Sequence, residues 1–311
     1  MSKDLHPAHG GRRVRHTVAI VAVSAAALAA GIGPVPGALA ASTGFSAGTA
    51  ASPLIALVTQ ARTTPDGNLL VKQGSLSAKW TREYSGVSEV AVASDPRHGP
   101  LIALVTDKGE VQAKEGSLSA KWTRERSGVL QVGSQIAVAS DSVHGPLIAV
   151  TGKGELLVKE GSLSAKWTRE HSGVYKVAVA SDPAHGPLVA TLTKKGELLV
   201  KQGSLAAKWT REHSGVSDIA VASDSAHGPL VAALLFTGHN LGDLLVKQGS
   251  LSAKWHYEHN EVFQVAVASD PAHGPLIGIQ TWTSDVLVKE GSLAAKWHHE
   301  HSGTSQVAVA G

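Results

Sequence analysis

The sequence contains no cysteine, so no disulfide can hold the chain together and its own hydrophobic core must stabilise it. Aromatic residues make up only 4% of the chain, which argues against an aromatic ligand platform in every part of it. After residue 40, no stretch approaches the roughly 18 uninterrupted apolar residues of a membrane span, and none has a helical period. These absences leave an all-β domain with a self-sufficient core.

The first 40 residues differ from the rest. Arg12, Arg13 and Arg15 precede the apolar stretch Thr17–Ala30, and Ala38–Ala40 ends the segment with small residues. A basic region, an apolar region and a small-x-small site predict a secretory signal peptide that is cut after Ala40. Export by a twin-arginine route and an uncleaved membrane anchor are the alternatives. Residues 41–51 are predicted to form a short linker.

The charge of the remaining chain is balanced. The whole sequence has a net charge of +3, and residues 1–40 hold four basic residues against Asp4, which also gives +3. The part after the leader is therefore neutral and has no basic excess for phosphate backbones. We expect no nucleic-acid partner and no membrane partner after cleavage. A neutral secreted surface suits uncharged ligands such as sugars.

Six near-copies of one segment fill the chain after the leader. The phrase Gly-Ser-Leu-(Ser/Ala)-Ala-Lys-Trp recurs, followed by (Val/Ile)-Ala-Val-Ala and then His-Gly-Pro-Leu. A tryptophan marks each copy, 42 to 46 residues after the previous one: Trp80, Trp122, Trp167, Trp209, Trp255 and Trp297. A period of this length indicates a repeat architecture.

Each copy is predicted to contain four short strands, A to D. In the third copy they are Ile136–Ser140, Leu147–Thr151, Glu155–Lys159 and Ala165–His171, with Gly and Pro in the connections. Four strands per repeat of this length are typical of a β-propeller blade. The small, apolar strand A suits the crowded centre, and the polar strand D suits the outer edge.

The ends of the array predict a closed ring. The repeats begin at a strand B, Pro53–Thr59, and finish at a strand A, Val307–Ala310. The C-terminal strand would complete the first blade and leave no open edge. The sequence therefore predicts that residues 52–311 form an all-β, six-bladed β-propeller closed by the C-terminal strand. Two β-trefoils and an open solenoid are the alternatives.

Several residue types recur in register. The tryptophans are predicted to pack between blades, with sugar stacking as the alternative. Lysines on strand C (Lys72 in the first copy) and glutamates three residues after each Trp predict exposed cross-strand pairs on the rim. The phrase Asp-x-x-His-Gly-Pro, as at Asp182 and His185, is typical of a turn, with metal binding or pH sensing as alternatives.

Candidate ligand-binding residues come from the phrase Trp-x-x-Glu-His and from one tryptophan outside it, Trp282. The recurrent set is Glu83, Glu125, Glu170, His171, Glu212, His213, Glu258, His259, Glu300 and His301. His299 and His301 share a strand face, but no third metal ligand is evident, so we expect no metal site and no cofactor. Nearly every candidate group occurs in several equivalent places, and no catalytic motif is present, so no catalytic residue is predicted.

Differences between copies are concentrated in three connections. The first B–C loop (Gln60–Asn68), the fifth B–C loop (Thr237–Asp243) and the D–A connection before the third blade (Leu130–Gln135) are longer than their counterparts. B–C and D–A connections emerge on the same face of a propeller, so this face is the predicted ligand face. Trp282 lies in the sixth B–C loop and is predicted to join it.

The phrases at residues 154–167 and 177–182 resemble repeats of secreted actinobacterial propeller proteins. More loosely, the repeat length and the register of Trp and Gly resemble the tachylectin and tectonin class of lectin propellers. That resemblance covers about residues 52–311 and implies glycan binding in equivalent pockets. The blade number and strand sequences differ from tachylectin, so no sugar specificity carries over.

The sequence as a whole favours a secreted, extracellular, multivalent carbohydrate-binding propeller without catalysis. Its expected partners are glycans or cell-surface polysaccharide. A protein-interaction scaffold is the alternative, and a propeller-type enzyme acting on glycosides is a third hypothesis.

Overall fold

The computed structural model describes residues 54–60, 67–73, 77–95, 97–129, 135–238 and 241–303. The predicted leader (1–40), the linker (41–51) and the closing strand Val307–Ala310 lie outside these residues. The described part of the chain is built of β-strands and turns, as predicted, and none of it forms a helix that could cross a membrane.

The strands follow the six sequence repeats. Repeat 1 contributes β1 (Leu54–Gln60), β2 (Gly67–Gln73) and the first part of β3 (Thr81–Asp95). Repeat 2 contains the rest of β3, β4 (Gly99–Thr106), β5 (Val111–Glu115) and β6 (Thr123–Arg126). Repeat 3 contains β7 (Gln135–Asp141), β8 (Gly145–Gly152), β9 (Glu155–Glu160) and β10 (Thr168–Ser172).

The second half of the chain repeats this arrangement. Repeat 4 contains β11 (Val174–Asp182), β12 (Gly186–Thr193), β13 (Leu198–Gln202) and β14 (Thr210–His213). Repeat 5 contains β15 (Val216–Asp224), β16 (Gly228–Gly238), β17 (Leu241–Gln248) and the first part of β18 (His256–Asp270). Repeat 6 contains the rest of β18, β19 (Gly274–Thr281), β20 (Val286–Glu290) and β21 (His298–His301).

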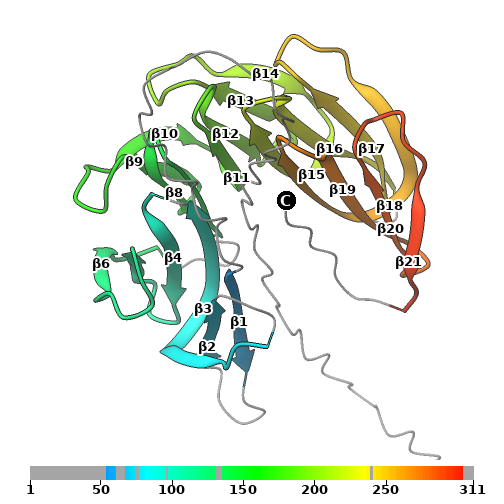
Figure 1. Cartoon of the computed structure of the whole chain (residues 1–311). Coiled ribbons are helices and arrows are strands. Elements are labelled where there is room, and N and C mark those ends of the chain that lie inside the picture. The colour runs from blue at the N-terminus through cyan, green and yellow to red at the C-terminus, as the bar shows by residue number, and fades with distance from the viewer. Residues whose placement is uncertain are drawn as a thin grey trace, which may run out of the picture.

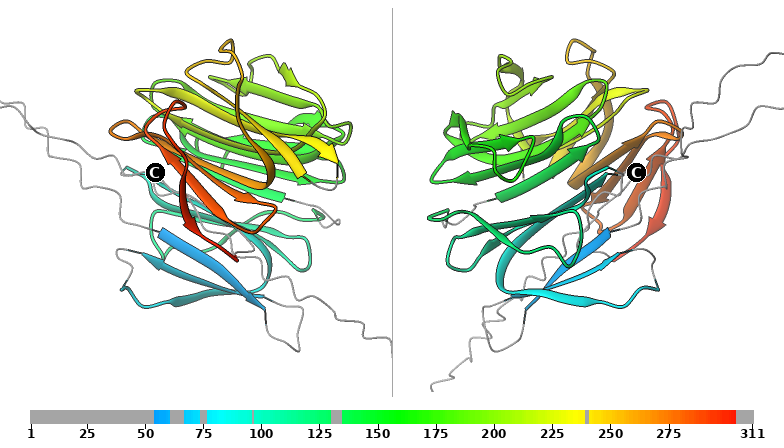
Figure 2. Two further views of the ribbon diagram at one scale, coloured as in Figure 1. Left: turned by 90° about the vertical axis from the view of Figure 1, so that its right-hand side faces the viewer. Right: turned by 60° about the vertical axis from the view of Figure 1, so that its left-hand side comes forward.

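Within each repeat, neighbouring strands pair antiparallel in chain order. Strands β3 and β18 run through the D–A junction without a break and join the sheets of two repeats. Figure 1 shows the sheets fanned around a common centre, with β1–β2 and β20–β21 at the two ends of the array, and Figure 2 gives two further views.

The A strands lie innermost, as predicted. A small cavity of about 90 Å³ at the centre is lined by the Val-Ala-Ser segments of five of them, on β3, β7, β11, β15 and β18. Small side chains allow these strands to approach one another around the axis. Strand D is largely exposed, which also agrees with its predicted place at the outer edge.

The core lies between neighbouring sheets. One cluster joins Leu147, Leu156 and Val158 of repeat 3 to Val177 and Val189 of repeat 4. Both faces of a middle sheet are covered in this way, so every residue of β12 is buried. This explains why the B strands are continuous apolar runs rather than alternating ones.

Two predicted boundaries are wrong. Strand D was expected over Ala165–His171, but it begins at Thr168, because the Ala165 N–H bonds to the Ser162 carbonyl in a turn (3.1 Å). Trp167 therefore precedes the strand. The long fifth B–C loop is mostly strand, since β16 and β17 extend it as a paired hairpin from Phe236↔Gly242 to Gly238↔Leu241.

The A–B turn packs tightly against the C–D connection of the same repeat. Gly186 has φ +71°, and a Cβ on it would lie 2.9 Å from the Gly203 carbonyl oxygen. Only glycine fits this contact and this backbone conformation without strain. Gly173, in the D–A connection, has φ +72° but nothing within 4 Å of its Cβ position.

Candidate functional site

The recurrent lysines and glutamates form buried ion pairs between repeats. Lys201 of repeat 4 donates to Glu170 Oε2 of repeat 3 and to the Leu205 carbonyl, and the two charged side chains are only 3% and 5% exposed. Equivalent pairs join all five described junctions: Glu83–Lys114, Glu125–Lys159, Glu170–Lys201, Glu212–Lys247 and Glu258–Lys289. The prediction of exposed cross-strand pairs on the rim is therefore wrong, because the next repeat covers these side chains.

The recurrent tryptophan completes each junction. Lys201 Nζ lies 5.0 Å from the centre of the Trp209 ring, and Trp209 Nε1 donates to the Glu170 carbonyl (3.2 Å). The ring also packs on the hydrophobic cluster between repeats 3 and 4. We call this set the Lys–Glu–Trp joint. It gives the tryptophan a packing contact, a hydrogen bond and a cation–π contact at once.

The predicted ligand-binding glutamates and histidines meet at these joints. His171, His213 and His259 lie edge-on to Trp209, Trp255 and Trp297, with ring centres 5.9, 6.0 and 5.7 Å apart. The five glutamates from Glu83 to Glu258 are held by their lysines. Glu300 and His301 lie exposed on β21. The structure thus brings most of the predicted glutamates and histidines together, but their side chains contact lysines and tryptophans of the neighbouring repeat.

The Asp-x-x-His phrase is turn chemistry, as predicted. Asp182 Oδ1 accepts the N–H groups of Ala184 (2.9 Å) and His185 (2.8 Å) and lies 3.0 Å from His185 Nδ1. Its Oδ2 accepts a hydrogen bond from Ser223 of the next repeat. Asp141 and Asp224 make the same contacts. Each aspartate therefore closes its own turn and ties one repeat to the next.

Histidines of the last strand also have local partners. His299 Nε2 lies 3.1 Å from Ser302 Oγ and 3.4 Å from Asp285 Oδ1. Hydrogen bonds from Ser302, Thr283 and His299 lower the pKa of Asp285 to about 2. Across the described ranges, no group of three or more His, Asp or Glu side chains is arranged to hold a metal ion.

The innermost strands carry polar residues at one shared position. Glu89 Oε1 accepts the Ile136 N–H of the next repeat (3.1 Å), and Lys176 pairs with Asp218 of the repeat that follows it. Burial raises the pKa of Glu89 to about 7, although the Ile136 N–H and the charge of Lys176 act in the opposite direction. One carboxyl near the axis therefore titrates near neutral pH.

The B–C and D–A connections lie together on one face, which we call the loop face. Backbone hydrogen bonds join them in four repeats: Asp107 N–H to Gly86, Lys194 to Gly173, Phe236 to Gly215 and Trp282 to Glu261, at 2.8 to 3.0 Å. The predicted common face is therefore confirmed. Residues 61–66 and 130–134, which make up most of the first B–C loop and of the D–A connection before the third blade, lie outside the described residues, as do residues 239–240 of the fifth B–C loop.

Four aromatic side chains outside the repeat phrase are exposed on the loop face. They belong to repeats 4 to 6, are 52% to 62% exposed, and are Tyr175, Phe236, Phe263 and Trp282. We call them the aromatic arc. Tyr175 and Phe236 line one pocket of about 450 Å³ together with Leu192, Lys194 and Val216. Exposed aromatic rings on one face make the arc a candidate interaction site, because single scattered rings are the ordinary case.

A β-bulge explains how two members of the arc are displayed. The pairing of β11 with β12 shifts between Val174 and Lys176, which leaves Tyr175 as the extra residue. The same shift leaves Phe263 on β18 and Ser217 on β15. Such a bulge turns one side chain away from the sheet. This position can therefore change from serine to an aromatic residue without disturbing the core.

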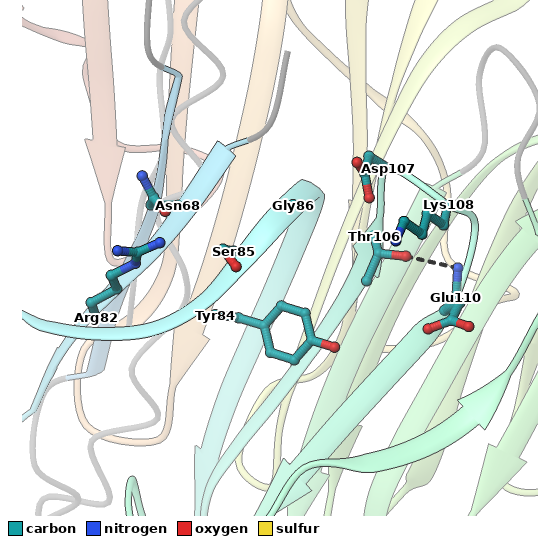
Figure 3. Close-up of a pocket in the computed structure, with 9 residues that line it drawn as sticks. All are labelled: Asn68, Arg82, Tyr84, Ser85, Gly86, Thr106, Asp107, Lys108 and Glu110. Atoms are coloured by element: carbon teal, nitrogen blue, oxygen red, sulfur yellow. Dashed lines mark hydrogen bonds between the residues drawn. The ribbon is translucent and has the colours of Figure 1, made fainter. Parts of the chain in front are cut away.

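A second pocket on the loop face is polar. It has a volume of about 480 Å³ and lies at the junction of repeats 1 and 2. Figure 3 shows Arg82 and Asn68 on one side, Asp107 and Lys108 on the other, and Tyr84 between them. The loop face thus has an aromatic region in repeats 4 to 6 and a charged region at the junction of repeats 1 and 2.

Comparison with solved structures identifies the fold. The chain is similar to the BP39L lectin from Burkholderia pseudomallei, with a TM-score of 0.55, 15% identity and 80% of each chain covered. It is also similar to BBS1N in complex with ARL6DN, with a TM-score of 0.54, 13% identity and 77% and 76% of the two chains covered. The SapL1 lectin in complex with alpha methyl fucoside gives a TM-score of 0.51 at 13% identity, with 79% of this chain and 95% of that chain covered.

These similarities, with the sheet arrangement, show that the chain has a β-propeller fold of the kind found in lectins. No protein-family model matches the chain, and comparison with curated protein sequences also gives no match.

Sequence reasoning found Trp282 but missed the other members of the arc. Their signal is present in the repeats, because Tyr175 and Phe263 replace the serine found at Ser88 and Ser217. Likewise, Phe236 and Trp282 occupy the position of Asp107 and Lys194. An alignment of the copies that searched for aromatic replacements at single positions would have revealed all four.

Proposed function

We propose that this protein is a secreted carbohydrate-binding β-propeller that acts without catalysis, and that the aromatic arc is its principal binding surface. The observation that carries this proposal is the grouping of Tyr175, Phe236, Phe263 and Trp282 on one face, although aromatic residues are only 4% of the chain. Aromatic rings bury large apolar areas at little entropic cost and can stack on the apolar faces of sugar rings.

The lectins among the similar structures support a glycan as the ligand. Two of the similar structures are lectins, and one of these is a complex with alpha methyl fucoside. The pocket beside Tyr175 and Phe236 has a volume suited to a small saccharide, and Lys194 at its edge can donate hydrogen bonds to hydroxyl groups. Several such contacts on one rigid scaffold favour polyvalent glycans.

We also propose that six blades close into a ring. Each described junction has a Lys–Glu–Trp joint, and the components of a sixth lie at opposite ends of the array. Lys72 lies 4.9 Å from the Trp80 ring centre, Trp80 is 40% exposed, and Glu300 is exposed on β21. Closure by the predicted strand Val307–Ala310 would bring Glu300 to Lys72 and Trp80.

The proposal is tested on a glycan array with the protein purified from the medium of an expressing host. N-terminal sequencing of that material is expected to begin at Ala41, whereas retention of residues 1–40 would contradict the proposed cleavage. We expect binding to one glycan class, competed by free sugar, with alpha methyl fucoside as the first competitor.

Two variants test whether the aromatic arc is the glycan-binding surface. Trp282→Ala and Tyr175→Ala are expected to weaken glycan binding about tenfold each, the effect of losing roughly 1.4 kcal/mol. Tyr257→Ala is the matched control, because Tyr257 is 61% exposed but lies on the outer strand of repeat 5. A folded protein that binds no glycan would instead favour the protein-interaction scaffold, with the same arc as its docking surface.

A further inference from the structure

The polar pocket at the junction of repeats 1 and 2 lacks an acidic residue that the other five repeats share. In repeats 2, 3 and 4, an arginine on strand D pairs with a glutamate at the start of strand C. The pairs are Arg124–Glu110 (2.8 Å), Arg169–Glu155 (3.0 Å) and Arg211–Glu197 (3.2 Å). Asp243 and Asp285 keep an acid at this position in repeats 5 and 6.

Repeat 1 alone has a neutral residue at this position. The equivalent residue is Asn68, whereas the arginine is retained as Arg82. Within the part of the chain that the structure describes, no carboxylate forms an ion pair with Arg82. Its guanidinium lines the pocket beside Asn68 (Figure 3).

The other charges of the pocket do not cancel this cation. Glu110 lies in the wall, but its carboxylate already pairs with Arg124 and accepts from Gln112 Nε2 (3.4 Å). Asp107 then contributes one negative charge, against the positive charges of Arg82 and Lys108. With Arg124 counted beside Glu110, the described charges at the pocket are three cations and two carboxylates, an excess of one positive charge.

We propose that this pocket binds the carboxylate of an acidic sugar, such as a uronic acid residue. Arg82 offers a planar pair of N–H donors that matches a carboxylate, and Lys108 adds a second cation from the opposite wall. Asn68 adds no charge to the wall, and the Tyr84 side chain provides aromatic surface for the sugar ring. This inference rests on the proposed function, because it assumes that the ligand is a glycan.

The test is calorimetric titration of the full chain at low ionic strength with glucuronic acid, glucose and acetate as probes. We expect glucuronic acid to bind most tightly, glucose at least tenfold more weakly, and acetate also more weakly because it lacks the sugar ring. Binding of acetate as tight as that of glucuronic acid would overturn the assignment to a sugar. The absence of glucuronic acid binding would overturn the whole inference.

Asn68→Glu is the decisive variant, since it rebuilds the cross-strand pair of repeats 2 to 4 and is compatible with the fold. We expect it to reduce glucuronic acid affinity at least tenfold, as should Arg82→Gln. Arg169→Gln is the matched control, because it removes an equivalent exposed arginine from repeat 3, and it should leave the affinity unchanged. Equal affinity of Asn68→Glu and the unmodified protein would contradict the inference.

Glycan binding at the aromatic arc and carboxylate binding at the Arg82 pocket can be tested independently of each other. Trp282→Ala is expected to weaken neutral glycan binding and to leave glucuronic acid binding unchanged. If neutral glycans bind and glucuronic acid does not, the carboxylate pocket alone is wrong. If Trp282→Ala removes both, the acidic sugar binds at the aromatic arc, and the assignment to Arg82 is overturned.

Discussion

At the scale of single residues, the most consequential groups are charges hidden between repeats. A buried pair is costly to form, because two ions leave water, and still more costly to break, because one ion remains without compensation. Lys201 and Glu170 are in this position. The Leu205 carbonyl and the Trp209 ring supply the remaining contacts of Lys201, whereas Glu170 Oε1 has no hydrogen-bond partner among the described residues. Their repetition across five junctions indicates that they specify how neighbouring repeats pack.

Removing one partner tests this role. Lys201→Met is expected to lower the free energy of unfolding by about 3–5 kcal/mol, because Glu170 would remain buried without its cation. Arg211→Gln, which breaks an exposed pair with Glu197 (3.2 Å), should cost less than about 1 kcal/mol. Urea unfolding of both variants measures the difference. Similar losses for the two would contradict a special role for the buried pair.

Glu89 predicts a pH dependence. Its pKa in the folded protein is about 7 against an ordinary value of 4.5, so the folded state holds the proton more tightly than the unfolded state. This residue's contribution to stability is therefore greatest below pH 4.5 and falls as the pH rises to about 7.

The variant Glu89→Gln removes this titration. At pH 4 it should match the unmodified protein, and at pH 8 it should be more stable by about 3 kcal/mol, since the glutamine avoids a buried charge. Denaturant unfolding at pH 4, 6 and 8 provides the measurement. A stability difference that stays constant across these values would show that Glu89 is not the group responsible.

At the scale of the strand and turn, the tight contact at Gly186 makes a matched test possible. Gly186→Ala combines an unfavourable φ with a clash at the Gly203 carbonyl, and we expect a loss of at least about 2–3 kcal/mol. Gly173→Ala has the same backbone penalty without the clash and should cost about 1–2 kcal/mol. Thermal unfolding of the pair separates the two effects, and equal losses would remove the clash from the explanation.

The strands could be predicted from the sequence because each repeat supplies the same local evidence. Gly, Pro and Asp mark the turns, and the Val-Ala-Val-Ala phrase marks the innermost strand. The joints could not be predicted, because Lys201 and Glu170 are 31 residues apart and their meeting depends on how one repeat packs on the next. The local pattern predicted that the lysine and the glutamate of one blade pair across adjacent strands. These charges were therefore wrongly predicted to lie exposed on the rim.

The loop face was predictable in outline for a similar reason. Strand order determines which connections share a face, so Trp282 was assigned correctly to the loop face. The display of Tyr175 depends on a bulge in the pairing of β11 with β12, and a bulge is a property of two strands together. The charged pocket required comparison of Asn68 with its counterparts, once the Arg–Glu pairs were known.

At the scale of the whole molecule, closure of the ring depends on how the two ends of the array meet. A closed ring would pair Glu300 with Lys72, as at the five described joints. In a double-mutant cycle with Glu300→Gln and Lys72→Met, we expect a coupling energy of at least about 1 kcal/mol. The Glu170–Lys201 cycle is the positive control. A coupling energy near zero would indicate an open array.

The Lys–Glu–Trp joint, which the described junctions share, determines how freely one repeat can be exchanged for another. Because each repeat presents the same lysine, glutamate and tryptophan, a repeat recognises a neighbour without recognising which neighbour it is. With respect to these joints the repeats are interchangeable, whereas the Lys176–Asp218 pair is specific to the junction of repeats 4 and 5. The order of the repeats fixes the separation of the aromatic arc from Arg82, so exchanging repeats by recombination would move one proposed binding surface relative to the other and leave the joints intact.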